Sequence, residues 1–320
     1  MRILVLGSSG FLGSHVTERL GATEGVRTLI GARSPGADLV VDLATARAGR
    51  LAEALAALSP DAVVNCAGAV GGDPVTLAEV NARGAAVLCA ALREAAPRAR
   101  LVHLGSAAEY GPGRAGETVT EEAPTRPVAP YGATKLAGTV AVTSSGLDAV
   151  VLRVGNPVGP GAPEAGLPGG LARRLHRAGG DTAEVVRLGD LSAYRDFVDV
   201  RDVARAAVLA ATRPEPVPPV LNVGGGRAVR VRELVRTLVR TAGFAGRIEE
   251  AGGGSARSAA VGWQCSDITA ARRALGWEPR LGLEDSLAAL WASVAGGPPG
   301  RAGRAGAGGA VAAPGGGAVR

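Results

Sequence analysis

The stretch of residues 2–13 constrains the fold of this chain more than any other. Residues 3–6 form an apolar run that indicates a buried strand, and three glycines follow at GxxGxxG spacing before a helical run over residues 15–20. A buried strand, a glycine-rich turn and a helix N-terminus together bring backbone amides close to a pyrophosphate. The stretch predicts a dinucleotide site made by Gly7, Ser9, Gly10, Phe11, Leu12 and Gly13.

Short apolar runs alternate with helical runs through the first half of the chain. The pattern predicts strands at residues 26–30, 40–43, 61–65 and 101–104, and helices at residues 47–58 and 77–95. Strands that alternate with helices are typical of βαβ units and of a parallel sheet. We therefore expect the α/β class: a doubly wound parallel sheet of the Rossmann type, with a smaller C-terminal substrate domain.

The end of the second predicted strand bears on the choice of dinucleotide. An acidic residue there would hold the ribose 2′-hydroxyl of NAD, whereas an arginine accommodates the 2′-phosphate of NADP. The chain has Arg33 and no acid at that point, so NADP(H) is favoured and NAD(H) stays open. After the third predicted strand, Asp42 can bind the adenine amino group while Leu43 packs on the ring.

Tyr131 and Lys135 stand four residues apart at the start of a predicted helix. Lys135 is the single lysine among the 35 lysines and arginines of the chain, so its ammonium has a task that a guanidinium cannot perform. At this spacing the two side chains share one helix face. A cation beside a phenol lowers the phenol pKa, which makes Tyr131 a candidate proton donor or acceptor near neutral pH.

Composition and charge exclude several other classes of protein. A net charge of +6 and a pI near 10.0 would fit nucleic-acid binding, but the arginines are scattered and no aromatic platform accompanies them. Attraction of an anionic small molecule explains the charge instead. The three cysteines have no metal-ligand spacing, and their odd number argues against a disulfide framework, so we expect neither metal nor disulfides. We find no signal-peptide core and no apolar run of membrane-spanning length, which favours a soluble cytoplasmic protein without a membrane partner.

Several motifs in chain order resemble those of the extended short-chain dehydrogenases/reductases, the nucleotide-sugar epimerase/dehydratase/reductase group. The motifs in the first half are GSSGFLG from Gly7, NCAG from Asn65, Asn81 at the opening of a helix, GSAAEYG from Gly105, and YGATK from Tyr131. The resemblance continues to about residue 295 through LRVGNPVGPG, YRDFVDVRDVARA, LNVGGG and LGWEP.

This resemblance implies roles for individual residues. It implies that Ser106, Tyr131 and Lys135 are catalytic: Ser106 and the Tyr131 phenol bind the substrate carbonyl, and Lys135 also holds the nicotinamide ribose. It implies further cofactor contacts from Cys66, Ala67, Gly68 and Asn81. Substrate contacts are implied for Ser106, Ala107, Asn156 and Arg195, the last two on a diphosphate. A salt bridge from Arg195 to Asp196, Asp199 or Asp202 remains an alternative.

The reaction is narrowed by the residues that follow Ser106. Ala107 and Ala108 stand where 4,6-dehydratases of the family carry acids, and Glu109 is expected to point elsewhere, so dehydration is not expected. With Arg33, the pattern most resembles the GDP-4-keto-6-deoxymannose reductases and related 4-ketoreductases of deoxysugar pathways. The NPVG motif at Asn156 also resembles NAD-dependent 4-epimerases, which stay open. So do a ketoreductase acting on a non-sugar secondary metabolite and a non-catalytic dinucleotide-sensing protein.

The expected domains interleave along the chain. Residues 1–155 plus about 196–222 would form the dinucleotide-binding domain, and about 156–195 plus 223–295 the substrate domain. Residues 296–320, almost all Gly, Ala, Pro and Arg, are expected to be disordered. The resemblance also implies a homodimer that packs through helices including the one that carries Tyr131.

Overall fold

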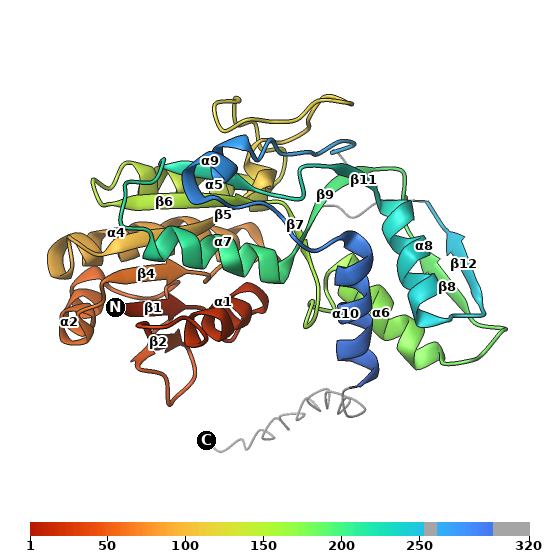
Figure 1. The fold of residues 1–320 in the computed structure, drawn as a ribbon, viewed down its shortest axis with the longest axis horizontal. Helices are drawn as coiled ribbons and strands as arrows, with labels where there is room; N and C mark the ends of the chain where they lie inside the picture. Colours follow the sequence, from red (N-terminus) through yellow and green to blue (C-terminus); the bar gives the residue numbers. More distant parts are fainter. Residues whose placement is uncertain (253–260, 297–320) are drawn as a thin grey trace, which may run out of the picture.

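The computed structural model describes residues 1–252 and 261–296, and the expected disordered tail lies outside the described residues except for Gly296. Figure 1 shows a large α/β lobe joined to a smaller lobe. The large lobe is built on a seven-stranded sheet in which every neighbouring pair is parallel. Its strands, in spatial order, are β3 (Leu39–Val40), β2 (Arg27–Ala32), β1 (Arg2–Leu6), β4 (Ala62–Asn65), β5 (Arg100–Ser106), β6 (Ala149–Val154) and β10 (Val220–Val223). The predicted doubly wound parallel sheet is confirmed.

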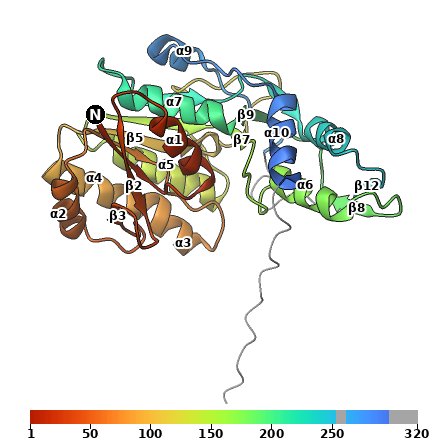
Figure 2. The same ribbon diagram turned by 60° about the horizontal axis from the view of Figure 1, so that its bottom comes forward.

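Helices cover both faces of this sheet, as Figure 2 shows. On one face α1 (Phe11–Gly21) packs beside α7 (Val200–Thr212), and α9 (Thr269–Leu275) lies next to α7. On the other face lie α2 (Ala48–Leu58), α4 (Gly84–Ala95) and α5 (Pro130–Thr143). The short helix α3 (Pro74–Ala78) continues through the π-helical turn η1 (Glu79–Arg83) into α4, and the 3-10 turn η2 (Ala107–Glu109) follows β5. Each face buries its own apolar core, because parallel strands covered on both sides carry apolar residues in both directions.

One helical run contradicts the expectation that no apolar segment reaches membrane-spanning length. In the described part of the chain, the helical run of residues 74–95 is, by length and composition alone, long and apolar enough to cross a membrane. Leu77, Leu88 and Leu92 of this run are buried, and α4 packs on α2 and α5. The run is apolar because one side of it faces the core of the large lobe.

The smaller lobe combines two short sheets with three helices. Its first sheet has the order β11 (Ala228–Arg230), β9 (Tyr194–Asp199), β7 (Asn156–Val158), and β8 (Val185–Leu188) pairs in parallel with β12 (Arg247–Glu250). The helices are α6 (Leu167–Ala178), α8 (Val231–Ala242) and α10 (Leu283–Ala295). Their buried leucines form a third core, in which α6, α8 and α10 contact one another.

One segment departs from the predicted division into domains. Residues 223–295 were all expected in the substrate domain, yet Ile268, Ala271, Leu275 and Trp277 belong to the core of the large lobe. The fully buried Trp277 donates its indole N–H to the backbone oxygen of Asp202 on α7, at 2.9 Å. The chain therefore returns to the large lobe through α9 before it enters α10, because this tryptophan and its apolar neighbours cover α7.

Candidate active site

The turn between β1 and α1 has the geometry of a cradle for a dinucleotide. Gly7 adopts a φ of +73°, and a Cβ on it would lie 2.7 Å from the amide nitrogen of Ala67. A Cβ on Gly13 would overlap the carbonyl oxygen of Gly7. Gly10 begins α1 without a side-chain cap, and the first turn carries no acid among the described residues. The amides of a first helical turn have no partner within the helix, and with the helix dipole they suit a pyrophosphate, so these residues fit the group that the sequence predicted.

The carboxyl end of β2 carries the residues expected near the adenosine. Arg33 follows the last residue of the strand and is exposed. Asp38, which the sequence reasoning missed, accepts a hydrogen bond from the Ile30 amide at 2.7 Å, so an acid lies at this strand as well. Asp42 is exposed and accepts from Ala44 N at 3.0 Å, whereas Leu43 is buried in the core.

The loop that follows β4 contains the predicted contacts Cys66, Ala67 and Gly68. Asn81 of the π-helical turn is buried, and its side-chain oxygen accepts from Ala69 N at 2.9 Å. Its Nδ2 donates to Ala69 O at 2.9 Å and to the Thr134 hydroxyl at 3.2 Å. Asn81 therefore fastens this loop to α5, so its amide acts on the site through the backbone.

Ser106 is the last residue of β5, at the carboxyl edge where ligands of open α/β sheets bind. Its Oγ accepts a hydrogen bond from Ala108 N at 3.2 Å. A hydroxyl that accepts in this way keeps its own proton to donate. Ala107, the next predicted contact, is buried.

Tyr131 and Lys135 lie one turn apart on α5, directly after Pro130 at the start of the helix. Tyr131 is half-buried, and Lys135 is only 5% exposed. The ammonium of Lys135 donates to the backbone oxygen of Leu104 at 2.5 Å. Burial lowers the pKa of Lys135 to about 8, against the opposing charges of Glu109 and Cys66. Lys135 also lies near Gly68, since a Cβ on that glycine would be 3.9 Å from Nζ.

Glu109 was expected to point away from the site, but the structure places its carboxylate against the backbone of Ser106. Its side chain is fully buried, and Oε1 accepts from the amide of Ser106 at 2.8 Å. Oε2 accepts from Arg153 Nε at 2.8 Å, and the Arg153 guanidinium lies 4.5 Å from the ring centre of Tyr110. Tyr110 in turn donates to Asn222 Oδ1 at 2.8 Å. A buried polar network thus runs from the amide of Ser106 to β6 and β10.

The predicted substrate contacts Asn156 and Arg195 lie on β7 and β9 of the smaller lobe. Asn156 Nδ2 donates to Gln264 Oε1 at 2.8 Å, and Arg195 Nη1 donates to the backbone oxygen of Tyr194 at 2.8 Å. Beside them, the rings of Tyr194 and Trp263 lie 4.8 Å apart, a pair that had no signal in the sequence.

The three acids that were offered as alternative partners of Arg195 have other contacts. Asp199 is bound by Arg201 at 2.8 Å and Asp202 by Arg205 at 3.1 Å. Asp196 accepts from the backbone amides of Gly225 and Ser266, and burial raises its pKa to about 6.

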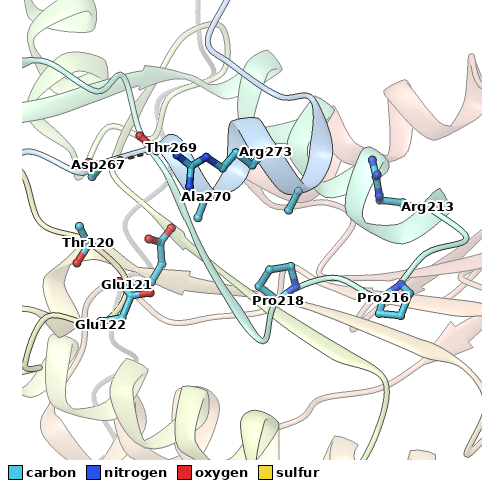
Figure 3. A pocket seen from close by; sticks show the side chains of 11 residues that line it. Thr120, Glu121, Glu122, Arg213, Pro216, Pro218, Asp267, Thr269, Ala270 and Arg273 are labelled. Carbon is cyan, nitrogen blue, oxygen red and sulfur yellow. Dashed lines mark hydrogen bonds between the residues drawn. The ribbon is translucent and has the colours of Figure 1, made fainter.

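A hollow of about 620 Å³ lies at the outer edge of the large sheet, next to β10 (Figure 3). It is lined by residues of three segments: Thr120, Glu121, Glu122, Arg213, Pro216, Pro218, Asp267, Thr269, Ala270, Arg273 and Ala274. It shares no residue with the predicted site, so we do not assign the cofactor to it. Within residues 1–252 and 261–296, no group of three or more His, Cys, Asp or Glu side chains is arranged to hold a metal ion.

Comparisons with known proteins agree with this geometry. The family model described as "NAD dependent epimerase/dehydratase family" matches residues 3–224. The chain is 38% identical over 303 residues to "dTDP-6-deoxy-L-talose 4-dehydrogenase (NAD(P)(+))" of Kitasatospora kifunensis, an alignment that covers 91% of this chain and 94% of the relative.

Two solved structures share the fold at similar coverage. RMD from Pseudomonas aeruginosa, complexed with NADPH, superposes with a TM-score of 0.78 at 26% identity, over 92% of this chain and 99% of that one. UDP-glucose 4-epimerase of Thermus thermophilus, in complex with NAD, gives a TM-score of 0.79 at 28% identity, over 92% of this chain and 99% of that one. The similarity thus extends over both lobes, beyond the sheet and its glycine turn.

Proposed function

The chain belongs to the NAD dependent epimerase/dehydratase family and is an NAD(P)-dependent enzyme of the extended short-chain dehydrogenase/reductase type; on that premise we propose that it reduces the 4-keto group of a nucleotide-linked deoxysugar with NADPH. The coarser assignment, a nucleotide-sugar enzyme of reductase, dehydrogenase or epimerase type, rests on the relatives. The direction and the cofactor preference rest on residues of this chain.

One observation carries the choice of hydride transfer without dehydration. The positions after Ser106 are alanines, and the nearest carboxylate, Glu109, is held by Arg153 and by the amide of Ser106. A dehydratase needs a free acid and base near the substrate to remove water. No carboxylate on the turn that follows Ser106 is free to transfer a proton in an elimination. The site therefore favours interconversion of ketone and alcohol without loss of water.

The proposed mechanism uses three side chains on two elements. When bound, the reduced nicotinamide supplies the hydride to the carbonyl carbon. The Ser106 hydroxyl donates a hydrogen bond to the carbonyl oxygen, and Tyr131 gives that oxygen its phenolic proton. The ammonium of Lys135, one turn along α5, stabilises the phenolate that remains until solvent returns a proton.

Arg33 supports NADPH as the reductant. A guanidinium at the end of β2 binds a 2′-phosphate with charge-assisted hydrogen bonds. The relative from Kitasatospora kifunensis makes dTDP-linked 4-keto-6-deoxysugars the first substrates to examine, and the resemblance to 4-ketoreductases adds GDP-linked ones. A 4-epimerase remains the second candidate, supported by Asn156 within NPVG and by the likeness to UDP-glucose 4-epimerase.

We also propose a homodimer that packs through α5, where Val140 is exposed on the helix that carries Tyr131. The small-molecule substrate and a second copy of the chain would then be its partners, in the cytoplasm.

The function is tested by mixing the purified protein with NADPH and 4-keto-6-deoxy nucleotide sugars, dTDP- and GDP-linked in parallel. We expect stoichiometric oxidation of NADPH with one of them. Tyr131→Phe should lower kcat by roughly 100-fold or more while NADPH still binds, because only proton transfer is lost. If NADPH is not consumed and NAD is released when the protein is denatured, the reductase is wrong and the epimerase is favoured.

A further inference from the structure

Two buried polar side chains beneath the cofactor loop are not used by the mechanism above. Asn65 ends β4, and its register partner on β5 is His103. Both are 1% exposed, and Asn65 Nδ2 lies 3.0 Å from His103 Nδ1. The side-chain oxygen of Asn65 accepts from the amide of Ala67 at 3.1 Å. A chain of two hydrogen bonds therefore runs from the imidazole to the backbone of the loop.

The chemistry of these donors fixes where the proton of His103 resides. A backbone N–H can only donate, so the Asn65 side chain must present its oxygen to Ala67 and its amino group to the ring. An amino group also only donates, so Nδ1 must be unprotonated, and a neutral ring then carries its proton on Nε2. Nε2 is buried and has no hydrogen-bond partner among the described residues. A buried N–H without an acceptor costs free energy of folding, so this cost at Nε2 has to be offset elsewhere. We look for the compensating role at Nδ1, which accepts from Asn65.

The loop held in this way forms one wall of the dinucleotide cradle. The amide of Ala67 is the closest atom to a Cβ placed on Gly7, at 2.7 Å, and Cys66 N donates to Leu6 O at 2.9 Å. The glycine turn and the Cys66–Gly68 loop thus touch through their backbones. A shift of Ala67 would move the wall against which the pyrophosphate turn is packed.

The charged and titratable groups around His103 also favour a neutral ring. Lys135 faces it from α5, and burial together with this charge holds the pKa of His103 well below its usual value. The thiol of Cys66 at the end of β4 is neutral, because burial raises its pKa to about 12. On the remaining sides β6 presents Val151, its register partner, and the α4 face of this core contributes Cys89, whose pKa burial raises to about 11.

We propose that His103 is a positioning residue for the dinucleotide: as a neutral ring protonated on Nε2, it accepts from Asn65 and so fixes the Ala67 backbone against Gly7. A ring protonated on both nitrogens would set two donors face to face. Turning the Asn65 amide would only move that conflict to the amide of Ala67. The loop geometry therefore requires the acceptor at Nδ1.

Two substitutions separate the acceptor from the volume of the side chain. His103→Phe keeps a ring of similar size but removes the acceptor, and should weaken the binding of both NADPH and NADH by about tenfold. His103→Asn places an amide oxygen near the position of Nδ1. It should bind NADPH within about twofold of the unmodified protein, although the cavity it leaves lowers the thermal midpoint. Binding is followed by nicotinamide fluorescence, which needs no substrate and so stands apart from the proposed reaction.

Val102→Ala is the matched control, since Val102 lies on the same strand and packs into the core on the opposite face. Val102→Ala should lower the stability of the protein without weakening the binding of NADPH. The proposal is overturned if His103→Phe binds NADPH normally, if His103→Asn binds as weakly as His103→Phe, or if Val102→Ala weakens binding equally.

Nitrogen-15 NMR of the three histidines tests the proton position in the unmodified protein, where no variant has to fold. The signals of His103 are assigned by their loss in the His103→Asn variant. They should show a neutral ring protonated on Nε2 over the pH range in which a free imidazole titrates, about 5.5 to 7.5. A proton on Nδ1 within that range would contradict the proposal.

Discussion

Lys135 illustrates how one residue can carry both a fold constraint and a chemical role. The ammonium is almost fully buried and reaches the backbone oxygen of Leu104, inside the carboxyl edge of β5. A guanidinium is planar and carries five N–H donors, so it would need more hydrogen-bond acceptors in the same space than the three donors of an ammonium. This physical difference accounts for one lysine in a chain that otherwise uses arginine.

Glu109 should act on Lys135 through charge. Glu109 raises the pKa of Lys135 and burial lowers it, to about 8, so the cation is present below that pH and is lost as the pH rises through it. We expect kcat to fall on the basic side of about pH 8. Glu109→Gln removes the supporting charge, so the basic limb should move to lower pH while the KM for NADPH changes little.

Glu109→Gln also leaves Arg153 buried without a carboxylate, which destabilises a fold by about 3–5 kcal/mol. The double variant Glu109→Gln with Arg153→Met removes both charges and serves as the matched control for stability. Its basic limb should be displaced in the same direction. An unchanged pH profile in both variants would contradict the coupling of Glu109 to Lys135.

Arg33 is predicted to select the 2′-phosphate. Arg33→Ala should reduce kcat/KM for NADPH by about tenfold or more, because a charge-assisted hydrogen bond is lost. The kcat/KM for NADH should stay within about threefold of that of the unmodified protein. Arg27→Ala is the control, since Arg27 is exposed at the opposite end of β2. Equal losses with the two cofactors would mean that Asp38 or another group sets the preference.

At the scale of elements, Asp196 joins three segments of chain. It lies on β9, and its two carboxylate oxygens accept from Gly225 N at 2.6 Å and Ser266 N at 2.9 Å. A Cβ on Gly224 would overlap this carboxylate, so the glycines after β10 leave room for it. The carboxylate thereby fixes the strand that carries Arg195, in which Phe197 is the register partner of Asn156 on β7.

Asp196→Asn should lower the free energy of unfolding by about 1–3 kcal/mol, because an amide offers one acceptor oxygen where two backbone N–H groups need one each. Asp181→Asn is a suitable control, since exposed Asp181 accepts from one amide, Ala183 N at 2.8 Å. Urea unfolding measures the free energy of unfolding of both variants and of the unmodified protein. Equal stability of Asp196→Asn and the unmodified protein would mean that the carboxylate does not hold these segments together.

The sequence predicted the elements well where local chemistry decides them. Helix α2 covers Ala48–Leu58, against the predicted 47–58, because Leu51 and Leu55 recur at helical spacing and are buried together. The predicted strand 40–43 is shorter in the structure, since Asp42 binds Ala44 N and starts a turn. The π-helical turn at Asn81 was not predictable, because the bonds of its side chain go to residues 69 and 134, distant in sequence.

The same limit applies to the site. The glycine turn and the pair Tyr131 and Lys135 were recognisable because their spacing is local, whereas Ser106 was identified through the resemblance of GSAAEYG to a motif of the family. The contacts of Glu109 with Arg153 and of Asn65 with His103 join residues tens of positions apart, and no periodicity reports them. The proposed roles of Glu109 and His103 are tested by the variants described above.

At the scale of the whole molecule, the dinucleotide turn is tied to the smaller lobe. Phe11, in the first turn of α1, packs against the core of α6, α8 and α10. His15, on the same helix, has its Nε2 3.0 Å from the backbone oxygen of Pro160, which follows β7. Helix α1, which follows the glycine turn, therefore contacts the segment that follows β7, and this fits a site where substrate and cofactor meet between the lobes.

The most direct test of the central claim is transfer of a label from the cofactor. The protein is incubated with NADPH deuterated at nicotinamide C4, each face labelled separately, and with the 4-keto-6-deoxy nucleotide sugar that it consumes. The account predicts that one face delivers one deuterium per product molecule, bound at C4 of the sugar. A product without deuterium, or an inverted sugar formed without consumption of NADPH, would contradict it.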